Sequence, residues 1–325
     1  MMIETRGLRK SFRGRGKTGT VEAVRGVDLS VGEGEIFGFL GPNGAGKTTT
    51  LRMLATLLPP DGGEATVAGA DLRTQPGEVR KRIGYVSQGG GVWDDSTARE
   101  ELELQARLYG MTRSEARSRA EAVIRAFQLE SFADRRAKTY SGGQRRRVDI
   151  ALGCVHRPRL VFLDEPTTGL DPQSRAHMWD EVRRLREMGM TVFITTHYLD
   201  EADALCDRLA IMDHGRIVVE GTPAQLKREV AGDVVTLGLN GAGATARKLL
   251  EGEPYVRGIE SVENTLRLYV EVGAAAIPQI LRRLDDQGIA LHSVELHRPS
   301  LDDVFLAKTG RSLRDEPATT KGGNR

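Results

Sequence analysis

The stretch GPNGAGKT, residues 41–48, lies between the apolar run EIFGFL (35–40) and the run TTTLRMLATLL (48–58). It matches the phosphate-loop pattern G-x-x-x-x-G-K-[ST] in full, and its flanks predict the strand and the helix that this pattern requires. The glycines leave room for backbone N–H groups around phosphate oxygens, and the helix N-terminus adds partial positive charge. Lys47 can reach the β and γ phosphates, and the Thr48 hydroxyl can hold Mg²⁺. We therefore expect a site for ATP and Mg²⁺ formed by Gly41, Pro42, Asn43, Gly44, Ala45, Gly46, Lys47, Thr48 and Thr49.

Two adjacent carboxylates follow a second apolar run, LVFL (160–163). This run predicts a buried strand that ends at Asp164 and Glu165. Asp164 is placed to hold Mg²⁺, and Glu165 is placed to polarise a water that attacks the γ-phosphate. A strand-end acidic turn would be the simpler interpretation of an isolated Asp-Glu pair. The phosphate loop upstream favours the catalytic interpretation.

The bulk composition indicates a water-soluble chain with two domains. Its 325 residues are more than one compact core usually takes, and the net charge of +2 gives no reason to expect a nucleic-acid partner. Cys154 and Cys206 lie in apolar helical surroundings, which predicts buried structural thiols. The N-terminus lacks a signal-peptide core, and no run approaches ~18 consecutive apolar residues. We therefore expect a cytoplasmic protein, and any membrane-spanning part should belong to another chain.

The first two thirds of the chain alternate between predicted strands and helices. Strands are expected at residues 3–12, 21–24, 27–31, 35–40, 64–67, 82–87, 160–163 and 191–195, with a hairpin around 213–216. From about Thr97 to Val155, apolar residues recur at helical spacing, and further helices are expected at 173–188 and 200–206. Apolar strands that alternate with helices predict an α/β domain with a parallel sheet covered on both faces.

After about residue 230 the order of predicted elements becomes β-α-β-β-α-β, which suggests a small ferredoxin-like α+β domain. Its strands are expected at 233–240, 255–261, 265–272 and 289–296, and its helices at 244–250 and 276–286. A further helix near 301–307 is expected to dock this domain. We therefore expect an ATPase domain over residues 1–228 with a helical subdomain at about 89–157, an accessory domain over 229–310, and a flexible tail over 311–325.

The stretch YSGGQ, residues 140–144, resembles the LSGGQ signature of the ABC ATPase family, with Tyr140 in place of the common leucine. An SGG tripeptide alone would be read as a turn, but the family's other motifs follow in order. Gln88 in YVSQ resembles the Q-loop glutamine, and Asp171 in GLD resembles the D-loop aspartate. The resemblance implies that this is a phosphate-loop ATPase with a helical signature subdomain.

Two further positions extend the resemblance, which covers about residues 1–225. His197 in FITTHYLDEA resembles the switch histidine of the family, and Phe12 stands where an aromatic residue stacks on adenine. An isolated histidine or phenylalanine at such places would more often be structural. The joint order and spacing of the motifs favour the functional interpretation.

The family implies a composite active site between two head-to-tail ATPase domains that enclose two Mg·ATP. Residues at the signature of one domain would approach the γ-phosphate held by the other domain, and these are Ser141, Gly142, Gly143 and Gln144. Backbone N–H groups at a helix N-terminus suit an anion. The resemblance further implies that Glu165 is the base, that His197 and Lys47 contact the γ-phosphate, and that Gln88 links Mg²⁺ to the helical subdomain. One such domain in this chain makes a homodimer the simplest hypothesis.

The stretches TYSGGQRRRVDIAL (139–152) and LHRPSLDDVFLAKTGR (296–311) resemble the daunorubicin-resistance subfamily of exporter ATPases. This narrower resemblance implies a separate membrane permease, attachment to the inner face of the cell membrane, and export of a drug, antibiotic or other hydrophobic compound. The ATPase motifs alone are compatible with import as well. The alternative function is a soluble ABC ATPase that acts on nucleic acid or ribosomes. The chain lacks the coiled-coil insertions, zinc modules and second ATPase domain that such relatives usually carry.

Two features of the sequence remain open to structural explanations. The run Arg145–Arg147 after the signature is interpreted as the solvent face of a helix rather than as a nucleic-acid contact. Trp93 follows the Q-loop position, where the family contacts its permease. Contact with a permease and packing within the protein are equally compatible with this residue.

Overall fold

The computed structural model describes residues 1–13, 19–230, 232–239, 243–262 and 265–309, and it divides into two compact units, Met1–Glu220 and Gly221–Arg325. The division precedes α8 (Pro223–Val230), which the sequence places within an ATPase domain ending at 228. This helix packs against α11 (Leu301–Thr309), so it belongs to the second unit. The tail expected over 311–325 lies outside the described residues.

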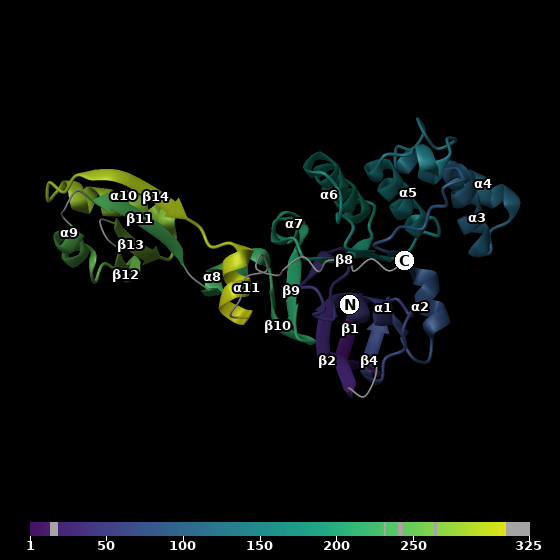
Figure 1. Cartoon of the computed structure of the whole chain (residues 1–325), viewed down its shortest axis with the longest axis horizontal. Coiled ribbons are helices and arrows are strands. Elements are labelled where there is room, and N and C mark those ends of the chain that lie inside the picture. The colour runs from purple at the N-terminus through teal and green to yellow at the C-terminus, as the bar shows by residue number, and fades with distance from the viewer. Residues whose placement is uncertain (14–18, 231, 240–242, 263–264, 310–325) are drawn as a thin grey trace, which may run out of the picture. The chain divides into compact units, whose positions relative to one another are not determined.

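A small antiparallel sheet with the strand order β2-β1-β4-β5 forms one part of the first unit (Figure 1). Its strands are β1 (Ile3–Arg13), β2 (Thr20–Val31), β4 (Gly62–Val67) and β5 (Ala70–Asp71). The expectation of separate strands at 21–24 and 27–31 is wrong, because β2 is continuous. Gly26 interrupts the regular strand, with a φ of 87°. The register between β1 and β2 shifts at this point, so the two strands stay paired on both sides of Gly26.

A six-stranded sheet with the order β10-β9-β3-β8-β7-β6 forms the centre of this unit. Its strands are β3 (Ile36–Leu40), β6 (Ile83–Val86), β7 (Leu160–Asp164), β8 (Thr191–Thr196), β9 (Arg208–Asp213) and β10 (Arg216–Gly221). The pairs β3–β8, β3–β9, β6–β7 and β7–β8 are parallel. Helices α1 (Lys47–Leu54), α2 (Pro76–Arg82), α6 (Pro172–Glu187) and α7 (Leu199–Leu205) accompany these strands.

The expected coverage of this sheet on both faces is confirmed. On one face, Phe37, Phe162 and Phe193 join α1 and the small sheet in one hydrophobic core, and the ring centroid of Phe193 lies 5.6 Å from that of Phe37 and 5.5 Å from that of Phe162. The other face lies against α7, where a Cβ at Gly38 would come within 2.6 Å of the Cys206 Sγ. Cys206 is therefore a buried packing thiol, and Cys154 is buried as well, as the sequence predicts.

Three helices form a separate group beside the central sheet, labelled together in Figure 1. They are α3 (Ala98–Leu108), α4 (Arg113–Ala126) and α5 (Gly142–Cys154), with a short 3₁₀ turn η1 (Ala137–Thr139) before α5. All three begin with a reciprocal capping box, in which the side chains of Thr97, Thr112 and Ser141 act as N-caps. This group of helices is the helical subdomain expected from the sequence.

The second unit contains a four-stranded antiparallel sheet with the order β12-β13-β11-β14. Its elements are β11 (Asp233–Leu239), α9 (Gly243–Leu250), β12 (Val256–Val262), β13 (Thr265–Val270), α10 (Gly273–Asp285) and β14 (Leu291–His297). The β-α-β-β-α-β order and this strand order define a ferredoxin-like fold. Inward apolar residues of β11 and β13 pack on α9 and α10, so the unit has a hydrophobic core of its own.

Candidate nucleotide-binding and catalytic site

The phosphate loop joins β3 to α1, and its glycines occupy positions that other residues would disturb. Gly41 and Gly46 have φ values of 152° and 109°. A Cβ at Gly41 would lie 2.1 Å from the Met212 carbonyl oxygen, and one at Gly46 would lie 2.4 Å from that of Ala23. At Gly44, in contrast, an added Cβ would meet nothing within 4 Å. The loop therefore packs closely on one side and faces open space on the other, as a phosphate cradle requires.

Lys47 is the first residue of α1 and is almost fully buried behind its own loop. Its Nζ donates to the carbonyl oxygens of Gly41 at 2.6 Å and Pro42 at 3.1 Å, and lies 3.7 Å from Glu165 Oε1. Phosphate oxygens are stronger acceptors for an ammonium group than neutral carbonyl oxygens. The site thus holds a buried positive charge that an anionic ligand can use.

Asp164, at the end of β7, meets the Thr48 hydroxyl from α1. Thr48 Oγ1 donates to Asp164 Oδ1 at 3.2 Å, and Thr195 Oγ1 donates to the same oxygen at 2.7 Å. The parallel register of β7 and β8 places Asp164 opposite Thr195. Hydroxyl and carboxylate oxygens are the hard ligands that Mg²⁺ prefers, so this donor set fits that ion.

Glu165 has a left-handed backbone conformation, with a φ of 44°. Its side chain contacts two other residues that the sequence predicts for the site, Gln88 and His197. Gln88 Nε2 donates to Glu165 Oε2 at 3.0 Å, and Thr168 Oγ1 donates to it at 3.2 Å. His197 Nδ1 lies 3.4 Å from the same oxygen, but its N–H direction does not give a well-aligned hydrogen bond. A non-glycine residue in this conformation is uncommon and marks a position held by its surroundings.

The charge state of Glu165 suits a proton acceptor. Burial by itself raises the pKa of this carboxyl, but the contact with His197 and the positive charge of Lys47 outweigh burial. The pKa of Glu165 consequently lies below its ordinary value of 4.5. The side chain is therefore a carboxylate at neutral pH and can accept a proton.

The signature residues form a second group on α5. Ser141 Oγ accepts the N–H of Gln144 at 3.2 Å, and Gln144 Oε1 accepts the N–H of Ser141 at 3.1 Å. The helix begins at Gly142, inside the signature and two residues earlier than an SGG turn followed by a helix would give. A Cβ at Gly143 would lie 3.5 Å from Ser174 Oγ on α6. Asp171 caps that helix by accepting the N–H of Ser174 at 2.9 Å, so the signature and the D-loop position lie together.

The other predicted nucleotide contacts differ in their exposure. Pro42 and Ala45 are buried within the loop, Asn43 is exposed, and Thr49 is half-buried on α1. Phe12 on β1 has 42% of its surface exposed, and Lys10 Nζ lies 5.9 Å from its ring centroid. An exposed aromatic ring of this kind is available for stacking on a flat ligand.

Sequence reasoning missed two residues that shape this site. The buried Thr195 holds Asp164 and also accepts the backbone N–H of Glu165 at 3.0 Å. The run TTH at the end of an apolar strand is the signal that could have indicated it. The solvent-face interpretation of Arg145–Arg147 is wrong for Arg146, which is buried and donates to three backbone carbonyls.

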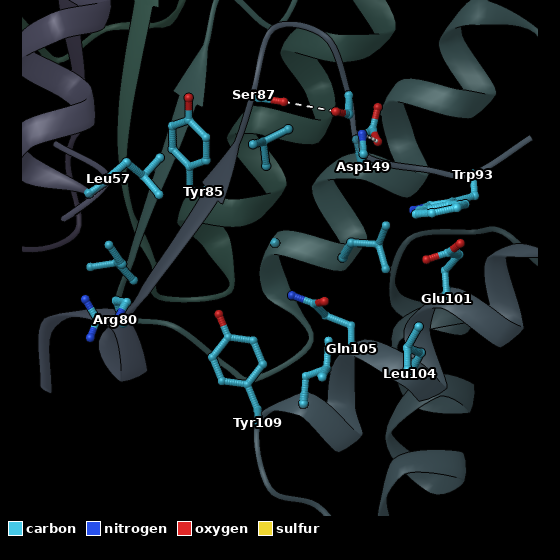
Figure 2. Close-up of a pocket in the computed structure, with 18 residues that line it drawn as sticks. Leu57, Arg80, Tyr85, Ser87, Trp93, Glu101, Leu104, Gln105, Tyr109 and Asp149 are labelled. Carbon is cyan, nitrogen blue, oxygen red and sulfur yellow. Dashed lines mark hydrogen bonds between the residues drawn. The ribbon is translucent and has the colours of Figure 1, made fainter. Parts of the chain in front are cut away.

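A groove of about 420 Å³ lies between the helical group and the central sheet. Figure 2 shows Leu57, Arg80 and Tyr85 on one side of it and Trp93 and Leu104 on the other. Trp93 is 74% exposed, so the packing alternative for this residue is wrong. Several apolar side chains are open to solvent along the groove, namely Leu57, Trp93, Leu104, Leu108 and Tyr109.

A phosphate loop opposite an acidic strand end, with a signature at a helix N-terminus on a separate helical group, defines the ATP-binding cassette class. The family model described as ABC transporter matches residues 24–168, and the model of the C-terminal domain of DrrA1-3-like ATP-binding proteins matches residues 221–309. The chain belongs to the ABC transporter family, as an ATP-binding protein of the daunorubicin-resistance type. It is an ATP hydrolase of the transport class.

Similar proteins cover almost the whole chain. The daunorubicin/doxorubicin resistance ATP-binding protein DrrA of Streptomyces peucetius is 46% identical over 96% of this chain and 94% of its own length. The linearmycin resistance ATP-binding protein LnrL of Bacillus subtilis is 35% identical over 97% of this chain and its own full length (100%). The Nod factor export ATP-binding protein I of Burkholderia lata is 38% identical over 96% of this chain and 98% of its own length.

Solved structures share the fold of about two thirds or more of the chain. A dimeric, post-hydrolysis structure of the ATP-binding cassette MJ0796 with ADP and Pi has a TM-score of 0.61 and 28% identity, covering 68% of this chain and 98% of that one. The structure of cbiO1 from Clostridium perfringens has a TM-score of 0.63 and 25% identity, covering 78% and 96%. Among the residues that the structure describes, no helix is both long enough and apolar enough to span a bilayer.

Proposed function

We propose that two copies of this chain close head to tail around two Mg·ATP and power a separate membrane permease. The observation that carries the proposal is the meeting of the phosphate loop, the acidic end of β7, Gln88 and His197 around Glu165. The signature group lies on another subdomain, beside the start of α6. In this proposal it serves the nucleotide bound by the partner copy.

The phosphate loop and Phe12 would bind ATP. The N–H groups of the loop would surround the phosphates on the side where Gly44 faces open space. Lys47 would exchange its bonds to the loop carbonyls for bonds to the β and γ phosphates. The exposed ring of Phe12 would stack on adenine.

Thr48, Asp164 and Gln88 would hold Mg²⁺. The contact between Thr48 Oγ1 and Asp164 Oδ1 at 3.2 Å places two oxygen donors side by side. When bound, Mg²⁺ offsets negative charge on the β and γ phosphates during phosphoryl transfer. Gln88 would add its amide oxygen, while its Nε2 keeps the contact to Glu165.

Glu165 would act as the general base. Its Oε2 would accept a proton from the attacking water, because its low pKa keeps it ionised. His197, 3.4 Å from that oxygen, would contact the water and the γ-phosphate. Ser141, Gly143 and the N-terminus of α5 on the partner copy would complete the anion site, and Asp171 would lie beside them.

The permease would dock in the apolar groove beside Trp93. A group of exposed apolar side chains that line one groove is typical of an interaction site, whereas single exposed apolar residues are not. The groove lies between the segment that carries Gln88 and the helical group, so a partner bound there could sense the nucleotide state. The names of the resistance and export relatives support the export of a drug, antibiotic or other hydrophobic compound. The chain would then work at the cytoplasmic face of the cell membrane.

Leu108→Glu tests this docking surface. Leu108 is 73% exposed on α3, so the substitution should leave folding intact while it places a charge in the groove. We expect the fraction of chain that sediments with membranes to fall about tenfold, because a buried charge without a partner costs an interface on the order of 1–2 kcal/mol or more. Met188→Glu, at an exposed apolar position outside the groove, is the matched control. Equal retention of the two variants would rule out the groove as the docking surface.

A further inference from the structure

Helix α5 carries two buried charged residues that the proposed nucleotide site does not use. Arg146 and Asp149, two and five residues after the signature, each have only 6% of their surface exposed. Burial of a guanidinium or a carboxylate is unfavourable unless hydrogen bonds and opposite charges compensate it. Their partners therefore indicate what these two residues do.

Arg146 binds the backbone on both sides of Glu165. Its Nη2 donates to the carbonyl oxygen of Asp164 at 3.3 Å, and its Nε donates to that of Pro166 at 3.0 Å. Glu165 lies between these two carbonyls in its left-handed conformation, with a φ of 44°. A planar guanidinium donates from three separate nitrogens in fixed directions, so it holds both carbonyls at set positions, whereas an ammonium group would have to reach both from a single nitrogen.

The same side chain also reaches the segment that carries Gln88. Arg146 Nη1 donates to the carbonyl oxygen of Ser87 at 2.6 Å. One turn later, Asp149 Oδ1 accepts the N–H of Gly91 at 2.8 Å and the N–H of Val92 at 3.3 Å. Both ends of the segment 87–92 are therefore attached to α5.

The side chain of Asp149 lies close to the backbone of Gly90, near the far end of this segment. Gly90 has a φ of 73°, and a Cβ there would lie 2.7 Å from Asp149 Oδ2. The attraction between Arg146 and Asp149 offsets part of the cost of burying each. The pair thus forms a compact connection between the signature helix, the Q-loop segment and the end of β7.

We propose that Arg146 is a positioning residue that fixes the backbone of Glu165 and, together with Asp149, couples it to the signature helix. This inference rests on the proposed role of Glu165 as the base. Ser141 caps the same helix that Arg146 occupies, so a shift of α5 when the partner's nucleotide binds would move the carbonyls flanking Glu165. The arrangement would make hydrolysis depend on engagement of the signature.

Arg146→Lys in the full-length chain tests the proposal. Lysine keeps the charge but offers one nitrogen in place of three carbonyl-directed donors. We expect kcat for Mg·ATP hydrolysis to fall by about 10- to 100-fold, since a base displaced by about 1 Å loses that much. The Kd for a fluorescent ATP analogue should change less than about twofold, since Arg146 lies behind the site and not in the phosphate loop.

Arg119→Lys is the matched control. Arg119 on α4 also donates to backbone carbonyls of the same helical group, at Cys154 and Val155, but it does not contact the site. It should keep kcat near the wild-type value even if its melting temperature falls. A wild-type kcat for Arg146→Lys would overturn the proposal. Loss of ATP binding together with turnover would also overturn it, because a joint loss indicates that Arg146 has a structural role only. Glu165→Gln, measured in parallel, separates this failure from a wrong assignment of the base.

Discussion

The Glu165→Gln variant should bind Mg·ATP with nearly wild-type affinity and hydrolyse it at least about 100-fold more slowly, as expected when a general base is removed. The amide has almost the same shape as the carboxylate and can still accept the hydrogen bonds from Gln88 and Thr168. It cannot take a proton from water. Lys47 and Thr48, which would hold the phosphates and Mg²⁺, are unchanged, so binding should survive.

Single-turnover hydrolysis of radiolabelled ATP and equilibrium binding of the same nucleotide separate these two effects. Glu187→Gln removes an exposed glutamate at the end of α6 and should leave both quantities unchanged. Turnover by Glu165→Gln within a few-fold of wild type would refute the assignment of the base. A loss of ATP binding would instead place Glu165 in the binding site rather than in the chemical step.

Mixing Lys47→Ala and Ser141→Arg subunits, each inactive alone, should restore hydrolysis. In a head-to-tail heterodimer, one site combines both lesions, and the other combines the intact phosphate loop of one copy with the intact signature of its partner. Random pairing at equal concentration should give about a quarter of the wild-type activity, if the two sites of a symmetric dimer are independent. Steady-state phosphate release across a range of mixing ratios measures this recovery.

A mixture of Lys47→Ala with Glu165→Gln is the matched control for subunit exchange. Both lesions lie on the same half of the site, so no heterodimer contains an intact site, and activity should stay at the background level. Recovery in the first mixture alone supports the composite site. No recovery in either mixture, with exchange confirmed by labelled subunits, would contradict the head-to-tail homodimer.

Local patterns made much of the fold and of the site predictable. The phosphate loop could be read from residues 41–48 because its function requires a fixed run of glycines before a helix. The β-α-β-β-α-β order of the second unit followed from apolar periodicity, and the strand order agrees with it. The side chains of Asp164 and Glu165 could be placed because an apolar run leads directly into them.

The remaining features depend on contacts between segments that are distant in the sequence. Arg146 has the same local pattern as its half-buried neighbours Arg145 and Arg147, and only the approach of β7 and of the segment after β6 makes it fully buried. Thr195 acts on Asp164 through the register of two parallel strands, which periodicity does not specify. The second unit begins at Gly221 and not after residue 228, because α8 packs against α11 from the far end of the chain.

The most direct test of the transport proposal is a pull-down of the Glu165→Gln protein with Mg·ATP from gently solubilised membranes of the organism that makes it. The slow variant should hold the ATP-bound dimer long enough to retain its partner, and Leu108→Glu in the same background is the control for the groove. We predict that a membrane protein with several spanning helices co-purifies and is lost with Leu108→Glu. Recovery of ribosomes or nucleic-acid complexes without any membrane protein would contradict the transport function while leaving the ATPase assignment intact.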